Sequence, residues 1–262
     1  MDEQVEASGR DDGSTVAAAG GVGSERAPCC RPSSRGAISA AAVGVAVAGF
    51  RASRRLRRWQ LRWGASEQEA TGALPGDGFV PAADLVATRA ITVAAPAERV
   101  WPWIAQLGQG RGGFYSYDRL ENLVGCQIHS ADSVVDEWQE VRVGDAVHLH
   151  PEVALEVVAV DPGRALVLRG AVPVAGAAAT NARAAGGRST KGRRADTSAD
   201  APYDFSWAFV LAEQEGATRL LVRERYGYLR PSAAALVEPV ALVSFLMTQR
   251  MLRGIRDRAE AA

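Results

Sequence analysis

The sequence predicts an α+β domain in which a curved antiparallel sheet wraps around one long C-terminal helix. Between residues 146 and 228, short β-branched and aromatic segments alternate with turn signals such as Asp161-Pro162-Gly163. After Pro231, apolar residues instead recur every three or four positions as far as about Arg258, which is the period of a helix. An antiparallel sheet must bury one face, and this helix is the only predicted element long enough to cover it.

Composition places the chain among ordinary globular proteins. It has 262 residues, of which 47% are hydrophobic and 23% charged, with 30 basic and 30 acidic side chains, enough for one core with tails. The formal net charge of zero argues against a nucleic-acid partner, because phosphate binding needs a surplus of Lys and Arg. Cys29 and Cys30 are adjacent and Cys126 stands alone, which excludes a disulfide scaffold and zinc spacing. We expect a reducing compartment, no metal and no other cofactor.

Three segments precede the predicted domain. Residues 1–35 lack an apolar period, which predicts a disordered tail. Residues 36–63 begin with an uncharged run of 15 residues and continue with six arginines: Arg51, Arg54, Arg55, Arg57, Arg58 and Arg62. Fifteen helical residues rise roughly 22 Å, less than the roughly 30 Å hydrocarbon core. This segment is therefore either a weak tether to the cytoplasmic face of a membrane or an Ala-rich tail without a membrane role. Residues 64–84 are rich in Gly, Pro and Ser, which predicts a linker.

The predicted domain, residues 85–262, begins with a strand and two short helices. Residues 86–93 are β-branched, and Pro96 then opens a helix with Val100, Trp103 and Leu107 at helical spacing. A second short helix is predicted over 117–124. Further strands are predicted over residues 146–150, 153–160, 164–169, 203–211 and 218–228.

Two further features belong to this domain. Residues 175–201 carry no large apolar side chain, which predicts a disordered insertion between neighbouring strands. The long helix contains Pro239, where we expect a kink. The resulting order of elements is that of a helix-grip fold, with a cavity between the sheet and the long helix.

Several sequence blocks point to a known superfamily. They are ITVAAPAERVWPWIAQLGQGRGGFYSYDRLENLVG (91–125), IHSADSVVDEWQ (128–139), VGDAV (143–147), DFSWAFVL (204–211) and RERYGY (223–228). With these blocks the domain resembles the START-like superfamily labelled SRPBCC, in particular its bacterial polyketide cyclase/dehydrase-like branch. The resemblance implies the helix-grip fold and the binding of lipids, sterols, hormones or polyketides, with catalysis in only some members. The insertion and the N-terminal tail depart from the family pattern.

Two motifs invite other interpretations. Residues 108–113 match G-x-G-x-x-G, but a dinucleotide site requires this loop between a strand and a helix. A helix precedes it here, so we expect a turn at the mouth of the cavity. His148 and His150 share one face of a strand, but Val147 and Leu149 form its apolar side. We therefore expect both histidines to face solvent rather than a metal.

Glu224 is the most informative polar residue. It shares a strand face with Val222 and Tyr226, whereas Arg223 and Arg225 lie on the other face. If the apolar face points inward, Glu224 and Tyr226 lie in the cavity as candidates for proton transfer or ligand anchoring. Alternatively, a shifted register places Glu224 outside, paired with one of these arginines.

We expect one cavity that binds a hydrophobic or amphipathic small molecule without catalysis. The alternative is a polyketide cyclase or dehydratase that uses Glu224 and Tyr226 as a proton-transfer pair. The expected cavity residues are Tyr115, Tyr117, Phe205, Trp207, Phe209, Val222, Glu224, Tyr226, Val243 and Met247. Few of them are polar, which favours binding. The sequence identifies neither the ligand nor the oligomeric state.

Overall fold

The computed structural model describes residues 34–123, 125–170 and 201–261. The predicted tail 1–35, apart from its last two residues, and the predicted insertion 175–201, apart from Ala201, lie outside this range. The chain divides into two units, residues 1–49 and 50–262. The sheet, the cavity and their contacts described below all belong to the second unit.

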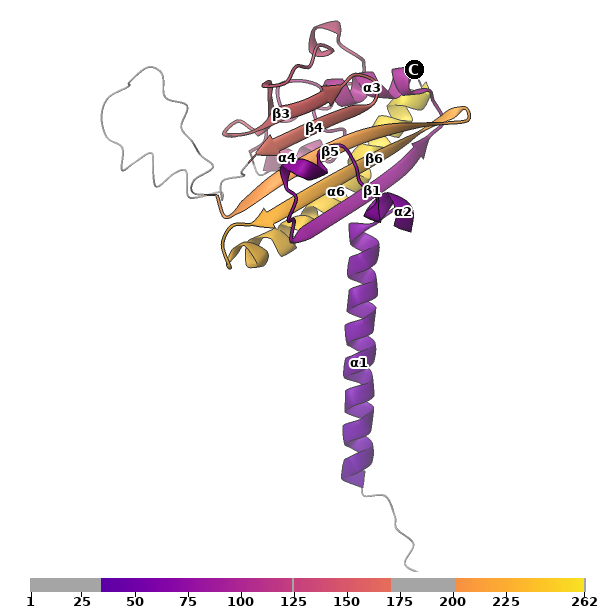
Figure 1. The fold of residues 1–262 in the computed structure, drawn as a ribbon, viewed down its shortest axis with the longest axis vertical. Coiled ribbons are helices and arrows are strands. Elements are labelled where there is room, and N and C mark those ends of the chain that lie inside the picture. The colour runs from indigo at the N-terminus through magenta and orange to yellow at the C-terminus, as the bar shows by residue number, and fades with distance from the viewer. Residues whose placement is uncertain (1–33, 124, 171–200, 262) are drawn as a thin grey trace, which may run out of the picture. The chain divides into compact units, whose positions relative to one another are not determined.

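Six strands form one antiparallel sheet in the order β1-β6-β5-β4-β3-β2 (Figure 1). They are β1 (Leu85–Val93), β2 (Ala146–His150), β3 (Val153–Asp161), β4 (Ala165–Gly170), β5 (Tyr203–Gln214) and β6 (Ala217–Tyr228). The first strand pairs with the last, so that Ala87 lies opposite Glu224 and Arg89 opposite Val222. This pairing brings residues from the two ends of the domain to the same place in the sheet.

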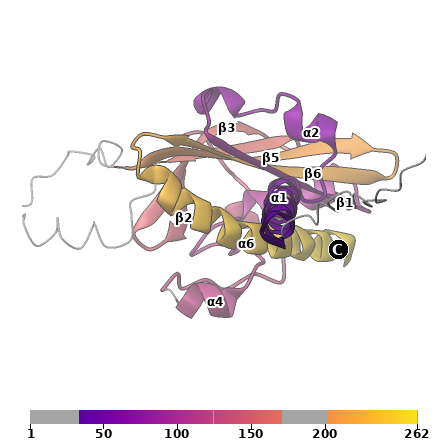
Figure 2. The same ribbon diagram turned by 90° about the horizontal axis from the view of Figure 1, so that it is seen from below.

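One long helix, α6 (Ala233–Ala261), crosses a face of the sheet (Figure 2). Its buried residues recur every three or four positions and include Val237, Ala241, Phe245, Leu252 and Ile255. The short helices α3 (Ala97–Ala105) and α4 (Asp118–Leu123) follow β1, and α3 buries Val100, Trp103 and Ile104. This arrangement confirms the predicted helix-grip fold. Pro239 lies within α6, and the helix continues through it.

The segment predicted as a linker packs against the sheet. It contains α2 (Glu67–Thr71) and the 3-10 turn η1 (Asp77–Phe79). The buried guanidinium of Arg223 donates to Asp77 at 2.7 Å and to the carbonyl oxygens of Glu69 and Gly72 at 2.7 and 2.9 Å. Arg223 and Glu224 are neighbours on β6, so α2 and η1 cover the face of the sheet opposite to that of Glu224. Residues 64–84 are thus part of the domain.

Among the described helices, α6 is long and apolar enough to cross a membrane, judged by length and composition alone. Packing against the sheet accounts for one side of α6, whereas Leu242, Val243 and Leu246 on this helix are exposed. The predicted tether, residues 36–63, lies mostly within α1 (Ser34–Leu61). The C-terminal end of α1 contacts α6: Trp59 lies 5.2 Å from the Phe245 ring, and the Gln60 side chain donates to the Ala241 carbonyl.

Candidate functional site

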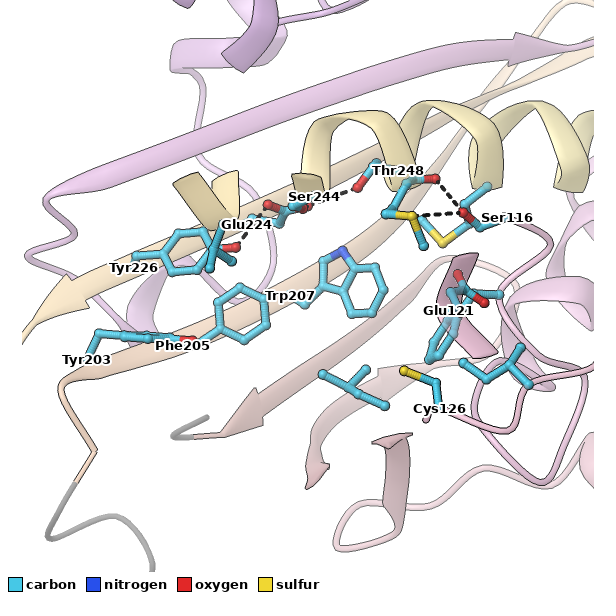
Figure 3. Close-up of a pocket in the computed structure, with 16 residues that line it drawn as sticks. Ser116, Glu121, Cys126, Tyr203, Phe205, Trp207, Glu224, Tyr226, Ser244 and Thr248 are labelled. Carbon is cyan, nitrogen blue, oxygen red and sulfur yellow. Dashed lines mark hydrogen bonds between the residues drawn. The ribbon is translucent and has the colours of Figure 1, made fainter. Parts of the chain in front are cut away.

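A cavity of about 280 Å³ lies between the sheet, α6 and the segment 114–128 (Figure 3). Aromatic and aliphatic side chains form most of its wall, and a few polar groups interrupt them. The lining residues are Phe114, Ser116, Glu121, Cys126, Ile128, Leu149, Tyr203, Phe205, Trp207, Glu224, Tyr226, Val240, Ser244, Met247, Thr248 and Met251. This volume lies near the lower end of the range of about 300–1,000 Å³ typical of small-molecule pockets.

The aromatic wall forms because side chains along β5 alternate between the two faces of the sheet. Phe205 and Trp207 are two residues apart, so both point to the side of the sheet covered by α6. The Phe205 ring lies 4.7 Å from that of Tyr226, and the Trp207 ring lies 6.0 Å from that of Phe114. These contacts hold the rings in fixed positions around the cavity.

Glu224 points to the cavity side and is held by four hydrogen-bond donors. Its side chain is 1% exposed. Oε1 accepts hydrogen bonds from Arg89 Nη1 at 2.7 Å, Ser244 Oγ at 2.6 Å and Thr248 Oγ1 at 3.0 Å. Oε2 accepts one from the Tyr226 hydroxyl at 3.2 Å. The structure thus places Glu224 inside, and the alternative of an outward Glu224 paired with Arg223 or Arg225 is wrong.

Arg89 lies on the neighbouring strand β1 and neutralises the charge of the Glu224 carboxylate. It is fully buried and lies over the Phe245 ring at 5.7 Å. Its Nε donates to the Gln60 carbonyl at 3.4 Å, which links the end of α1 to the ion pair. Burial and the nearby Glu224 charge raise the pKa of Tyr226 well above its usual value of 10.0. Tyr226 therefore stays protonated and donates to Glu224 at physiological pH.

Glu121 is the second carboxylate in the cavity, and the sequence analysis missed it. It lies on α4 and is 6% exposed. Its Oε2 is buried and has no hydrogen-bond partner among the described residues. Burial and, to a smaller extent, repulsion by Asp118 raise the pKa of this carboxyl to about 7, although a hydrogen bond from the Ser116 hydroxyl opposes the shift. Glu121 is therefore a group that ionises near neutral pH, and one of its two oxygens has no hydrogen-bond partner in the described part of the chain.

Trp207 supplies another unsatisfied group. Its Nε1 is buried and, within the described part of the chain, has no acceptor. Figure 3 shows the indole in the middle of the cavity, with its nitrogen on the edge that faces α6 in this view. Buried polar atoms without a partner are rare, so Trp207 Nε1 and Glu121 Oε2 are candidate contacts for a ligand.

Five of the ten predicted cavity residues lie in the cavity wall: Phe205, Trp207, Glu224, Tyr226 and Met247. Whether they bind a ligand stays a prediction. The other five lie elsewhere. Val243 on α6 is 56% exposed, and Tyr117, the residue before α4, is 46% exposed. Tyr115, Phe209 and Val222 are buried in the core. Tyr115 accepts a hydrogen bond from Gln106 and packs edge-on against Trp103.

The glycine loop forms a closed turn beside β2. Gly108 and Gly113 pair as an isolated bridge with φ values of 128° and 71°, which an L side chain rarely adopts. The Gln109 amide donates to the His148 carbonyl at 2.8 Å. Residues 108–113 do not line the cavity, whereas Phe114 and Ser116, which follow them directly, do. His148 is exposed as predicted, whereas His150 is only partly exposed and accepts a hydrogen bond from the Glu152 amide. The described residues contain no cluster of three or more metal-ligating side chains.

Comparison with known proteins returns similar structures but no family. No protein-family model matches the chain, and no curated protein does. The protein CV1439 from Chromobacterium violaceum is 13% identical, with a TM-score of 0.34, over 67% of this chain and 96% of its own. Truncated norcoclaurine synthase from Thalictrum flavum is 13% identical, with a TM-score of 0.36, over 66% of this chain and 91% of its own.

DynU16, a protein in the dynemicin biosynthetic locus, is also similar. It is 15% identical with a TM-score of 0.32, and the match covers 65% of this chain but only 46% of DynU16. The chain thus spans about half of DynU16.

Proposed function

We propose that the domain is a ligand-binding module of the SRPBCC type, which holds one compact apolar or amphipathic molecule in the cavity without transforming it. The observation that carries the proposal is the cavity itself. It has a mostly apolar and aromatic wall, and its few polar groups come from different elements, as in typical ligand pockets. Its volume of about 280 Å³ favours a compact molecule over a diacyl lipid.

The state of Glu224 favours binding over the cyclase or dehydratase alternative. A general acid or base must exchange a proton with the substrate at hydrogen-bond distance. Glu224 Oε1 already accepts three hydrogen bonds, and Oε2 accepts one from Tyr226. The raised pKa of Tyr226 also makes this hydroxyl a poor proton donor to a substrate. The pair is therefore better suited to holding the cavity wall in place than to transferring protons.

The test uses the full chain and a neutral apolar dye, N-phenyl-1-naphthylamine. We expect saturable binding of one dye molecule per chain, with enhanced fluorescence. Native mass spectrometry of protein purified from its own host should in addition reveal a copurified small molecule. Absence of both would overturn the proposal. A copurified molecule that the protein converts to another compound on incubation would favour the enzyme alternative.

We also propose that the domain is cytoplasmic and associates with the inner face of a membrane through residues 36–63. Its support is the surface at the end of α1, where Leu56 and Trp59 are exposed beside several arginines. The exposed arginines are Arg51, Arg54, Arg55 and Arg58. Aromatic and aliphatic side chains among basic residues are typical of helices at an anionic lipid surface.

A further inference from the structure

The two carboxylates of the cavity differ in charge compensation. Glu224 has Arg89 at 2.7 Å. Within the described residues, Glu121 has no cationic partner, and its buried Oε2 accepts no hydrogen bond. Among the described residues that line the cavity, none is basic. A ligand that enters this space therefore meets one uncompensated acidic group.

We infer that the cavity binds a compact amine, whose protonated nitrogen pairs with Glu121 and whose apolar body lies against the aromatic wall. The inference deepens the proposed binding function and rests on it. A buried carboxylate without a counter-ion is costly, and a bound cation reduces that cost. The hydrogen bonds of such a pair are charge-assisted and therefore stronger than those between neutral groups.

The aromatic wall suits a cation equally well. Phe114 and Trp207 lie 6.0 Å apart and both line the cavity with Glu121. Aromatic faces attract cations through the negative charge of their π-systems. An acidic or phosphorylated ligand would meet no basic side chain among the described residues of the cavity wall, and the ionised Glu121 would repel it. Trp207 Nε1 offers a donor for an oxygen atom on the same ligand.

The ionisable groups around Glu121 indicate that binding of an amine should depend on pH. Asp118 on the same helix raises the pKa of Glu121, and Cys126 lies close enough for Glu121 to raise its pKa in turn. The elements across the cavity contribute Tyr203, Tyr226 and the neutralised Glu224, and α6 contributes no charged side chain to the wall. His150 lies beside Gly125, outside the wall. The pKa of Glu121 is about 7, so this carboxyl is mostly ionised at pH 8 and protonated at pH 5.5.

The test compares 2-(2-naphthyl)ethylamine with its neutral counterpart 2-(2-naphthyl)ethanol by calorimetric titration of the full chain. We expect the amine to bind at least about tenfold more tightly than the alcohol at pH 8. This preference should disappear at pH 5.5, where the amine is still protonated but Glu121 is neutral. It should also disappear in Glu121→Gln at pH 8. The matched control is Glu215→Gln, which changes an exposed acid in the turn between β5 and β6 and should keep the preference.

The outcomes separate this inference from the function on which it rests. Equal binding of amine and alcohol by the unaltered chain at pH 8 would overturn the amine inference and leave the binding module intact. Binding of N-phenyl-1-naphthylamine but of neither probe would do the same. Failure to bind the dye and both probes would overturn the binding function itself. The pH comparison uses the unaltered chain, so the inference can be refuted even if Glu121→Gln does not fold.

Discussion

Met247 offers the most direct test of the cavity, because Met247→Trp should fill it. Met247 lines the cavity from α6 and is half-buried. Tryptophan adds about six non-hydrogen atoms to this position. If they occupy the space of about six ligand atoms, each contributing about 0.3 kcal/mol, the binding free energy falls by about 2 kcal/mol. The dissociation constant of a bound apolar dye should therefore increase about 20-fold.

The same substitution should have little effect on folding. In a closely packed core, the extra atoms would cost roughly 1–3 kcal/mol through strain. A cavity of about 280 Å³ accepts them without displacing the sheet. For a domain of this size, 1 kcal/mol corresponds to about 2–4 °C in Tm, so we expect the Tm to change by less than about 2 °C.

Val243→Trp is the matched control. Val243 lies four residues earlier on the same helix and is exposed, so the new ring should extend into solvent. We expect dye affinity and Tm to stay at their original values. Fluorescence titration with N-phenyl-1-naphthylamine and a thermal melt measure both quantities for each variant. If Met247→Trp bound dye normally and its Tm fell by more than about 4 °C, the site would be packed and the reasoning refuted.

Four further predictions concern other parts of the molecule. Glu224→Gln should lower the free energy of unfolding in urea by about 3 kcal/mol, because Arg89 would stay buried without its counter-ion; an unchanged midpoint would contradict this. Glu121 has a folded-state pKa of about 7 against 4.5 for the free side chain, so its ionisation favours the unfolded chain as the pH rises through this interval. Glu121→Gln should therefore melt above the unaltered protein at pH 8 but not at pH 4, and an equal difference at both pH values would refute this sign. Joining β4 to β5 by a short Gly-containing turn in place of residues 176–200 should cost less than about 1 kcal/mol in urea, because Gly170 and Phe205 already pair; a loss of several kcal/mol would show that the segment packs. Changing the exposed arginines of α1 to Glu should abolish cosedimentation with phosphatidylglycerol vesicles, and undiminished binding would contradict the membrane proposal; the four are Arg51, Arg54, Arg55 and Arg58.

The strands and most helices could be predicted from the sequence because their signals are local. The predicted strand 146–150 coincides with β2, and the strand predicted over 218–228 begins one residue after β6 does. The linker prediction failed for a long-range reason. Gly and Pro in residues 64–84 indicate turns. The segment packs on the sheet because the buried Arg223, about 150 residues away in sequence, donates to the carbonyl oxygens of Glu69 and Gly72.

The cavity face of α6 shows the limit of periodicity. Of the two α6 residues predicted to line the cavity, Met247 does so, whereas Val243 is exposed. The cavity face also contains Ser244 and Thr248, and the buried Ala241 and Phe245 lie outside the cavity wall. Because Leu242, Val243 and Leu246 are apolar but exposed, two sides of this helix carry an apolar pattern. Only contact with the sheet distinguishes them.

Glu121 was missed for a related reason. Helix α4 reverses the usual pattern, because it exposes Leu120 and Leu123 while it buries Glu121. A helix with these residues predicts an outward acid and inward leucines. The ion pair of Arg89 could not be predicted either, because its partner Glu224 is 135 residues away in sequence. The pairing of β1 with β6 brings them together, and no local pattern encodes that register.

The environments of the two cavity carboxylates separate their roles. Glu224 contacts β1 through Arg89, α6 through Ser244 and Thr248, and its own strand through Tyr226. Removing it would leave a buried cation and loosen three elements together, so its contribution is to stability. Glu121 lies on a six-residue helix near the surface, with a raised pKa and a free buried oxygen. Substitution of Glu121 by Gln removes a charge that forms no ion pair with any described residue. Different surroundings give two identical side chains different chemistry, and of these two carboxylates Glu121 is the one with an unpaired oxygen among the described residues.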